Sequence, residues 1–474
     1  MNMYLIGNRH SKTIIILFPF TSLPGVDSGG KLWIRERPMK GHVHIFTYGC
    51  QMNDLDTQKM YTLLARDGWT PTETLDKAGL IVLNTCSVRQ KAYEKALSNI
   101  GRLRPYKRRN PSLVIVVTGC IAQQKGAEIM ERMPHVDAVL GTHQLHRIAE
   151  VARSCAEGNG PVSDTEMSPC IPSLDIVPDR DFVSPPHRAY LNIMQGCDNC
   201  CSYCIVPSVR GRETSRSHAG ILAEVREHAA RGVKEIFLLG QNVNSYSGGA
   251  SFPSLLREIS AVGGISRIRF TTSHPKDMGP DLMACFADLE KLCSHIHLPF
   301  QSGSDAVLRR MNRSYTKQGY LGLISGLRSA RPDISFSADV IVGFPGETGR
   351  EYLQTIGLIE EVRFDLLYSF KYSPRPGTKA ALMEDDVPPD EKNRRLSELQ
   401  AIQKGITMEN HRALVGGTFE VLVDGQSARN PDQVHGRTSR NTIVNFPGKP
   451  GLAGTFRNVK ITRANPNSLT GERA

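Results

Sequence analysis

The chain has 474 residues, of which 40% are hydrophobic and 22% charged, a composition typical of globular proteins with about two to four domains at ~100–200 residues each. No apolar run approaches the roughly 20 residues of a membrane-spanning helix, which argues against a membrane protein, and a formal charge of +11 favours an anionic partner such as nucleic acid. Eleven cysteines are too few for a disulfide scaffold of this length, so we expect reduced, metal-binding thiols and a cytoplasmic protein.

The first 38 residues differ in composition from the rest of the chain. Residues 22–31 are rich in Gly, Ser and Pro, and the apolar run at residues 13–18 is too short for the core of a signal peptide. We therefore predict that residues 1–38 are a disordered extension, or sequence upstream of a start at Met39.

A first domain is predicted at residues 39–157, where three short apolar runs each end next to a cysteine: Cys50, Cys86 and Cys120. The runs, at residues 43–48, 80–83 and 113–117, are typical of buried strands, and helical patterns follow at residues 54–67, 87–104 and 124–133. Strands alternating with helices predict a parallel sheet, in which all carboxyl ends lie along one edge. We expect the three thiols to meet at that edge, although buried structural cysteines are the alternative.

A proline-rich stretch at residues 158–186 has the composition of a linker. A second domain is predicted at residues 187–411, where strand-like runs alternate with amphipathic helical stretches. The pattern indicates a partial (βα)6 barrel whose loops, following the strands, face one mouth. The six runs lie at residues 189–194, 235–239, 267–272, 296–300, 335–342 and 366–372.

The loop after the first of these strands carries Cys197, Cys201 and Cys204 with the spacing Cys-x3-Cys-x2-Cys. Three thiolates on one short loop can hold three irons of a [4Fe–4S] cluster and leave the fourth iron open, because cysteine is the usual ligand of such clusters. A closed zinc site would need a fourth ligand. Cys200 is the nearest thiol, but it would have to fold back past its neighbour in the chain.

Polar residues and a glycine follow other strands at the same mouth, in positions where apolar side chains would pack better. These candidates for cofactor binding are Gln241, Asn242, Gln301, Ser302 and Gly343.

Two arginines and two tyrosines near the mouth are further candidates. Arg210 and Arg212 follow the cysteine loop and suit a carboxylate or phosphate, with a solvent-facing ion pair as the alternative. Tyr203 and Tyr372 are candidates for stacking on a base, although ordinary packing is the simpler interpretation of each.

A third region, residues 412–474, follows a helical segment at residues 388–412. Its short strand candidates, punctuated by Gly and Pro, predict a small β-barrel of the kind that exposes strand faces and loops to nucleic acid. The region has nine Lys and Arg against four Asp and Glu, a balance that favours binding to a phosphate backbone. The strand candidates are residues 419–423, 433–437, 442–446 and 456–462.

These motifs together resemble the radical S-adenosylmethionine methylthiotransferase family. The Cys197 loop and the six βα units are similar to the radical-SAM core, the domain with Cys50, Cys86 and Cys120 resembles the family's N-terminal domain, and the C-terminal barrel resembles a TRAM domain. Residues 48–53, 83–89 and 297–304 resemble the branch that modifies tRNA, since the ribosomal-protein branch has Pro and Lys where Gln51 and Met52 stand.

The resemblance implies an enzyme with two [4Fe–4S] clusters and S-adenosylmethionine as cofactors. One cluster, on Cys197, Cys201 and Cys204, would cleave S-adenosylmethionine to a 5′-deoxyadenosyl radical, and the other would carry sulfur that a second S-adenosylmethionine methylates. The expected substrate is tRNA with an isopentenylated adenosine next to the anticodon, modified at C2. The polar mouth residues, Gln241 and Ser302 among them, would contact S-adenosylmethionine. Other expected partners are an electron donor such as a flavodoxin or ferredoxin and a sulfur donor, and we expect a monomer.

Other functions are compatible with parts of this pattern. A methylthiotransferase could instead act on a ribosomal-protein side chain or on threonylcarbamoyl-adenosine. A non-catalytic RNA-binding redox protein is a third hypothesis, but electron-transfer clusters usually have four cysteine ligands, whereas each set here has three.

Overall fold

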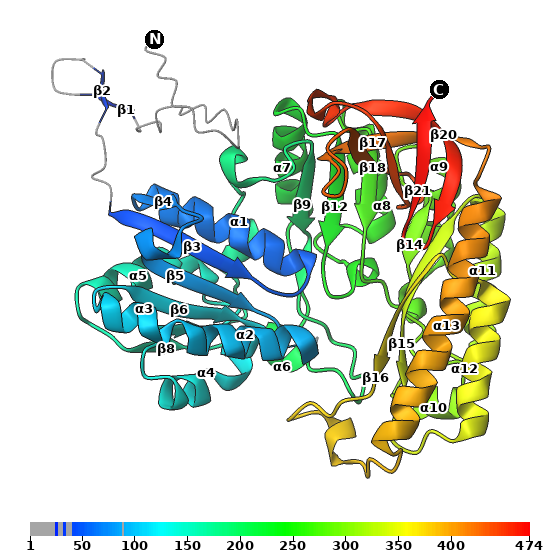
Figure 1. The fold of residues 1–474 in the computed structure, drawn as a ribbon, viewed down its shortest axis with the longest axis horizontal. Helices are drawn as coiled ribbons and strands as arrows, with labels where there is room; N and C mark the ends of the chain where they lie inside the picture. Colours follow the sequence, from blue (N-terminus) through cyan, green and yellow to red (C-terminus); the bar gives the residue numbers. More distant parts are fainter. Residues whose placement is uncertain (1–23, 27–31, 35–39, 88–89) are drawn as a thin grey trace.

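The computed structural model describes residues 24–26, 32–34, 40–87 and 90–474 (Figure 1). Most of the predicted extension at residues 1–38 lies outside the described residues. Its two described segments, β1 (Pro24–Val26) and β2 (Leu32–Ile34), pair antiparallel. Three parts follow in chain order: a parallel-sheet domain, a half-barrel of βα units, and a small closed β-barrel. This is the mixed α/β architecture that the sequence predicted.

The N-terminal domain is a parallel sheet with helices on both faces. Its strand order is β4-β3-β5-β6-β7-β8, and the predicted strands β3, β5 and β6 are adjacent at its centre. Helices α1 and α4 begin earlier than predicted, directly at the cysteines. The strands are β3 (Gly41–Thr47), β4 (Trp69–Pro71), β5 (Ala78–Thr85), β6 (Val114–Gly119), β7 (Ala138–Leu140) and β8 (Val162–Asp164), and the helices are α1 (Gln51–Arg66), α2 (Gln90–Arg102), α3 (Arg104–Arg109), α4 (Cys120–Arg132) and α5 (Ile148–Ala156).

The stretch predicted as a linker, residues 158–186, contains β8, which extends the N-terminal sheet by pairing with β7. It also contains a 3-10 turn at Pro172–Asp175 that packs beside Lys59 of α1. Lys59 is 2% exposed, and its ammonium donates to the carbonyl of Ser173 (2.7 Å) and to the side-chain oxygen of Asn192 (2.8 Å) in the half-barrel. This part of the chain is therefore packed against both domains, while the exact domain boundaries remain predictions.

Lys59 makes the stability of the folded chain depend on pH. Burial, reinforced by the charge of Arg216, lowers the pKa of Lys59 from 10.5 to about 8. Between those two values the unfolded chain binds more protons than the folded chain, so stability should rise with pH, by roughly 3 kcal/mol over the window. We expect the difference in unfolding free energy between the natural chain and Lys59→Met to grow by that order from pH 7.5 to pH 10. Parallel stability curves for the two chains would contradict this.

The central domain is an open half-barrel of six parallel strands, as predicted. The strands form two groups, β9-β12-β13 and β14-β15-β16, joined by a bridge between Ile268 and Leu292. The strands are β9 (Arg188–Asn192), β12 (Glu235–Leu239), β13 (Arg267–Phe270), β14 (His295–His297), β15 (Ser335–Val342) and β16 (Leu366–Lys371), and the helices are α6 (Val206–Arg210), α7 (His218–Ala230), α8 (Phe252–Ala261), α9 (Pro280–Asp288), α10 (Asp305–Arg310), α11 (Lys317–Ala330) and α12 (Gly349–Val362).

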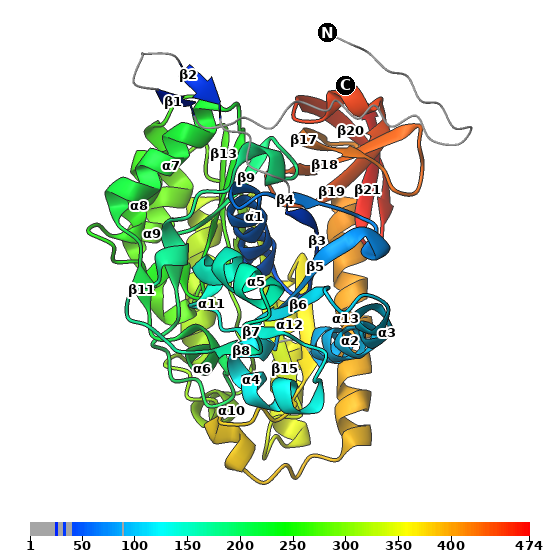
Figure 2. The ribbon, with the colours of Figure 1, turned by 90° about the vertical axis from the view of Figure 1, so that its left-hand side faces the viewer.

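Helix α13 (Pro389–Ala413) runs from the loop end of the half-barrel to the C-terminal barrel (Figures 1 and 2). That barrel is closed, with strand order β17-β18-β19-β21-β20. Four of its strands were predicted, and β21 was not. The strands are β17 (Thr418–Gln426), β18 (Gln433–Thr438), β19 (Ile443–Pro447), β20 (Phe456–Asn465) and β21 (Ser468–Arg473). Among the residues that the structure describes, no helix is both long enough and apolar enough to span a membrane.

A buried ionic network fixes the C-terminal barrel to the amino ends of the half-barrel strands. Glu235, which is fully buried at the start of β12, accepts from Arg188 (2.5 Å) and Arg269 (2.8 Å). Arg188 also donates to Asp424 (2.9 Å), and Arg269 to the carbonyl of Thr438 (2.5 Å). The C-terminal barrel therefore sits at the end of the half-barrel opposite the mouth.

Candidate active site

Cys50, Cys86 and Cys120 lie where three adjacent parallel strands end. Thr47 of β3 pairs with Asn84 of β5, and Thr85 of β5 pairs with Gly119 of β6, so the strand ends are level. None of the eleven cysteines forms a disulfide bond. Burial is the main cause that raises the pKa of Cys50 and Cys120, and Cys120 is close enough to Cys50 and Cys86 for their charges to interact. The predicted meeting of the three thiols at one edge of the sheet is therefore present.

Glycines before two of these cysteines allow the close approach. Gly49 has φ +116°, and a Cβ there would lie 2.4 Å from Cβ of Cys86. Gly119 has φ +90°, and its Cβ would lie 2.4 Å from the carbonyl oxygen of Thr85. Any larger residue would push the strand ends apart, which explains the Gly-Cys pairs at both sites.

A buried arginine from the half-barrel reaches this N-terminal thiol cluster. Arg210, at the end of α6, is 3% exposed, and its Nη2 donates to Asn53 and Asp56 of α1, each at 2.9 Å. Its positive charge opposes the effect of burial on the pKa of both Cys50 and Cys120. Arg212, two residues later, is 89% exposed and pairs with Asp198. Of the two arginines named from the sequence, Arg212 is thus the solvent-facing ion pair, and Arg210 is not.

Cys197, Cys201 and Cys204 form the second thiol cluster, on the loop between the paired strands β10 (Met194–Gln195) and β11 (Thr214–Ser215). The sulfur of Cys201 accepts from Nη1 of the buried Arg313 at 3.3 Å. The sulfur of Cys197 accepts from the backbone amide of Asn199 at 3.4 Å. Burial, with the charge of Cys201, raises the pKa of Cys204 to about 12.

The chemistry of both donor sets fits an iron–sulfur cluster. Each set offers three cysteines outside any disulfide, in a largely buried place with an arginine beside it, and thiolate is the ligand that such clusters require. Within the described part of the chain, no group of three or more His, Cys, Asp or Glu converges on the position of a single metal ion.

Helix α6 connects the two thiol clusters. It begins two residues after Cys204 and ends at Arg210, so the six residue-to-residue steps from Cys204 to Arg210 span at most ~22 Å. The end of α6 is held by the N-terminal domain: Thr142 donates to the carbonyl of Val209 (2.6 Å), and Nε2 of His143 donates to the carbonyl of Arg210 (3.0 Å). The two clusters therefore belong to one site built across two domains.

The predicted cofactor-binding residues line the loops at the mouth, and their polar groups are partly used by the protein itself. Gln241 accepts from the amide of Gly196 at 2.6 Å, which fixes the start of the cysteine loop. Asn242 donates to Asp277 at 2.7 Å, and its buried Oδ1 has no hydrogen-bond partner in the described structure. Gln301 has φ +64°, and Ser302 is 1% exposed beside Thr355. Contact of these residues with S-adenosylmethionine stays a prediction.

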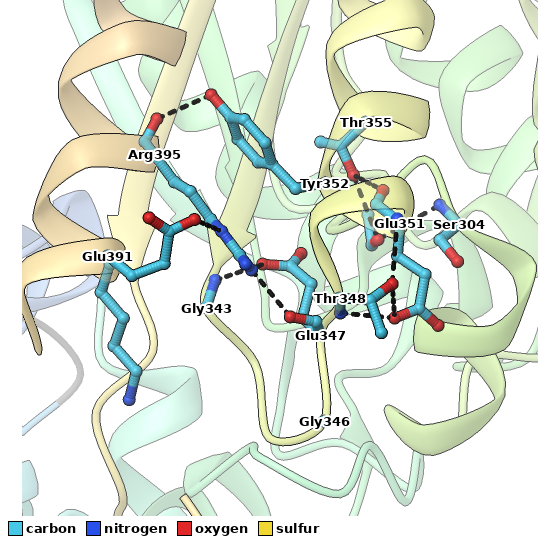
Figure 3. Close-up of polar contacts among 12 residues, drawn as sticks. Ser304, Gly343, Gly346, Glu347, Thr348, Glu351, Tyr352, Thr355, Glu391 and Arg395 are labelled. Atoms are coloured by element: carbon cyan, nitrogen blue, oxygen red, sulfur yellow. Dashed lines mark hydrogen bonds and ion pairs between the residues drawn. The ribbon is translucent and has the colours of Figure 1, made fainter. Parts of the chain in front are cut away.

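The loop after β15 is held by α13. The carboxylate of Glu347, a buried residue, accepts from the amide of Gly343 (2.6 Å) and from Arg395 of α13 (2.8 Å). Figure 3 shows Arg395 reaching both the carboxylate and the backbone carbonyl of Glu347. This pairing was not found from the sequence, because its partners lie 48 residues apart and belong to separate helical and loop patterns.

The aromatic residues exposed near the mouth differ from those named in the sequence. Tyr203 and Tyr372 pack against Phe344 in a small core, which is the simpler of the two interpretations considered. Tyr368 and Phe370 of β16 are instead 42% and 39% exposed. Their alternation with the packed Leu367 is the sequence signal that would have placed them on an open face of the strand.

Three family models match the chain in the order of its three parts. The Uncharacterized protein family UPF0004 matches residues 42–141, the Radical SAM superfamily matches residues 191–359, and the TRAM domain matches residues 412–473. The first model contains all three cysteines of the N-terminal thiol cluster, and the second contains the Cys197 loop.

Curated relatives match nearly the whole chain. A tRNA-2-methylthio-N(6)-dimethylallyladenosine synthase of Geobacter metallireducens is 50% identical over 440 residues, which are 91% of this chain and 98% of the relative. A protein of the same name from Geobacter sulfurreducens is 48% identical over 439 residues, covering 91% and 97%. Among solved structures, the radical S-adenosylmethionine methyltransferase TsrM of Kitasatospora setae superimposes with a TM-score of 0.54 at 15% identity, over 73% of this chain and 74% of that one, a likeness of fold.

Proposed function

This chain belongs to the family of tRNA-2-methylthio-N(6)-dimethylallyladenosine synthases, and we propose that it replaces the C2 hydrogen of N6-isopentenyladenosine, next to the anticodon of tRNA, with a methylthio group. The observation that carries the proposal is the pair of three-thiol clusters joined by α6. A radical-forming centre and a sulfur-carrying centre must both reach one base. Two three-thiol sites connected through the short helix α6 would provide that arrangement.

Cys197, Cys201 and Cys204 would hold one [4Fe–4S] cluster, and Cys50, Cys86 and Cys120 a second. When bound with S-adenosylmethionine, these groups supply radical chemistry at one centre and a carrier for sulfur at the other. Such chemistry is needed because the C2–H bond of adenine is not acidic, so that general acid–base groups cannot activate it.

The protein's own residues bind and orient these groups. Arg313 donates to Cys201 and places a positive charge beside that sulfur. Gln241 fixes Gly196 and with it the approach of the Cys197 loop. Glu347, held by Arg395, keeps the loop after β15 in one conformation beside the mouth. Each contact reduces the reorganisation that the site would otherwise undergo during the reaction.

The open face of β16 is suited to an unstacked RNA base. Leu366, Tyr368 and Phe370 are all about two-fifths exposed and share one face of the strand. The opposite face meets α13, since Gln400 of α13 donates to Ser369. Figure 1 shows α13 on the side of β16 away from the N-terminal domain, so the open face is turned toward that domain. Loop nucleotides of RNA are commonly splayed out and stacked on aromatic rings in this way.

Truncating the open face should weaken RNA binding. We expect Tyr368→Ala to reduce the affinity for an isopentenylated anticodon stem-loop by about 1–3 kcal/mol, the usual value of one base stacked on one ring. Because the side chain is 42% exposed and its ring lies beside that of His297 (centroids 5.9 Å apart), the melting temperature should fall less than after truncation of a buried ring. Leu353→Ala on α12, where the side chain is 62% exposed, serves as the control and should bind normally. Equal affinities for both variants would exclude β16 from the RNA site.

The proposed function is tested by mass spectrometry of tRNA nucleosides. Cells without this gene should lack 2-methylthio-N6-isopentenyladenosine and accumulate N6-isopentenyladenosine. The natural gene should restore the methylthio nucleoside, and a gene carrying Cys120→Ala should not. Unchanged tRNA nucleosides, together with loss of a methylthio group from a ribosomal protein, would instead favour the ribosomal-protein branch.

The remaining partners follow from the chemistry. Reductive cleavage of S-adenosylmethionine needs a low-potential electron donor such as a flavodoxin or ferredoxin, and repeated turnover needs a sulfur donor. We propose that the chain acts as a monomer, because both thiol clusters are supplied by one chain.

A further inference from the structure

We propose that Arg210 is a positioning residue of the sulfur-carrying centre: its Nη1 donates a hydrogen bond to the anionic sulfur held there, and its charge tunes the cluster on Cys50, Cys86 and Cys120. The inference rests on the proposed function, since it requires that this second cluster exists. It assigns a role in the N-terminal centre to a residue of the radical-SAM part of the chain.

One half of the Arg210 guanidinium is fully used and the other half is not. Nη2 is divided between Asn53 and Asp56, at 2.9 Å each. Nη1 is buried without a hydrogen-bond partner within the described residues. Leaving a buried donor of a charged group without a partner is costly, and the charge of Arg210 already opposes the rise that burial causes in the pKa of the Cys120 thiol beside it, so we infer that the missing acceptor is the sulfur of the loaded site.

The acceptor must be at the N-terminal thiol cluster. Asn53, which receives Nη2, lies three residues after Cys50, and the Cys50 sulfur is 4.0 Å from the same Asn53 oxygen. Val209, the neighbour of Arg210 in α6, packs against Cys120 in one small apolar group with Ile205. The guanidinium is therefore enclosed between α1 and α4, with thiols as the anion-forming groups beside it.

The position of Arg210 is set independently of its own charge. Thr142 and His143 hold the last carbonyls of α6, at 2.6 and 3.0 Å, so the helix end stays in place when the side chain is changed. A planar guanidinium also offers separate donors to two acceptors at once, which an ammonium on a flexible chain does less well. A cation at this place stabilises the more negative, reduced form of the cluster and retains anionic sulfur.

The charge effect is measurable without substrate. In the full chain carrying Cys197→Ala, Cys201→Ala and Cys204→Ala, reconstitution should leave one cluster, whose midpoint potential is measured by electron paramagnetic resonance during redox titration. Adding Arg210→Gln should lower that potential by at least 59 mV, a tenfold change in the equilibrium for one electron. Adding Arg210→Lys should recover part of the shift, and Arg212→Gln, which removes an exposed charge, should leave the potential unchanged.

Asp56→Asn separates this role from a structural one. Both Asp56→Asn and Arg210→Gln break the same ion pair, so a purely structural role would lower the melting temperature in both and shift the two potentials alike. Our proposal predicts shifts of opposite sign, because one variant removes a negative charge and the other a positive charge near the cluster. An unchanged potential in Arg210→Gln, or shifts of the same sign, would overturn it.

Failure to assemble the cluster is also decisive. If Arg210→Gln binds no iron while the melting temperature of its iron-free form is normal and Arg210→Lys restores iron, the proposal stands. If the iron-free form is destabilised as in Asp56→Asn, the proposal is wrong. If the parent chain with three alanines binds no iron, the second cluster and the proposed function fail, whatever Arg210 does.

Discussion

Replacing Cys197 with alanine should abolish the cleavage of S-adenosylmethionine and leave the N-terminal cluster intact. The two thiol clusters belong to different domains, no cysteine is common to both, and none forms a disulfide. Iron content after reconstitution should therefore fall from about eight to about four per chain, as expected for two clusters of four irons. The readouts are iron per chain and formation of 5′-deoxyadenosine under reducing conditions.

Two further variants sharpen this result. Cys200→Ala removes an exposed thiol from the same loop and should change neither readout. Cys120→Ala should lose the N-terminal cluster and the methylthio product, yet still form 5′-deoxyadenosine. Continued cleavage of S-adenosylmethionine by the Cys197→Ala chain would show that the radical centre has been assigned to the wrong cysteines.

Replacing Glu235 with alanine should destabilise the chain by about 3–5 kcal/mol, because breaking a buried ion pair leaves charges without compensation. Although burial opposes it, the charges of Arg269 and Arg188 lower the pKa of Glu235 to about 2. The folded-state pKa is thus below the ordinary value of 4.5, so this stabilisation is present above pH 4.5 and is lost as pH falls toward 2.

The same substitution should loosen the C-terminal barrel. Without Glu235, Arg188 and Arg269 lose the carboxylate that positions them. These two arginines also bind Asp424 and the Thr438 carbonyl of the C-terminal barrel. We expect faster proteolytic cleavage near the end of α13 and weaker RNA binding. Glu227→Ala, which breaks a half-exposed pair with Arg231 on α7, is the matched control and should cost less than about 1 kcal/mol. Equal melting temperatures for the two variants would contradict the network's role.

Docking of the barrel away from the mouth has a consequence for RNA binding. The barrel contacts the amino ends of the half-barrel strands through Arg188 and Arg269, whereas the thiol clusters lie at carboxyl ends. A tRNA that contacts both must extend along the molecule. Helix α13 spans this length, and its Arg395 also holds the loop at Glu347 beside the mouth (Figure 3).

Hydrophobic periodicity was sufficient to predict the long helices and strands, but it did not reveal the short strands. The six strands of the half-barrel were predicted because each is an apolar run followed by an amphipathic helix. Strands β4, β7 and β8 have three residues each, too few to show any period. Strand β21 is mostly polar, and closure of the barrel, rather than its own sequence, places it between β19 and β20.

Helix α1 shows how an interface changes a pattern. Its buried residues include Asn53, Asp56 and Lys59, which a search for an apolar stripe treats as solvent-facing. They are buried because the half-barrel covers them and supplies partners: Arg210 for Asn53 and Asp56, and Asn192 for Lys59. The helix was predicted to begin at residue 54 but begins at Gln51. Its first turn lies at the thiol cluster, where buried polar residues hide the helical pattern.

The amino-acid sequence by itself was sufficient to single out the six thiols that we propose as cluster ligands, because ligand spacing within a loop and the position of a cysteine at a strand end are local properties. It also determined the order of the three parts and the class of chemistry. Only the tertiary structure decided which charged side chains lie beside these thiols and which aromatic rings are exposed near the mouth. Arg210 and Arg212 are alike in sequence, but one is buried by partners 154 and 157 positions away and the other faces solvent. Burial depends on such distant contacts, and they have no local signature.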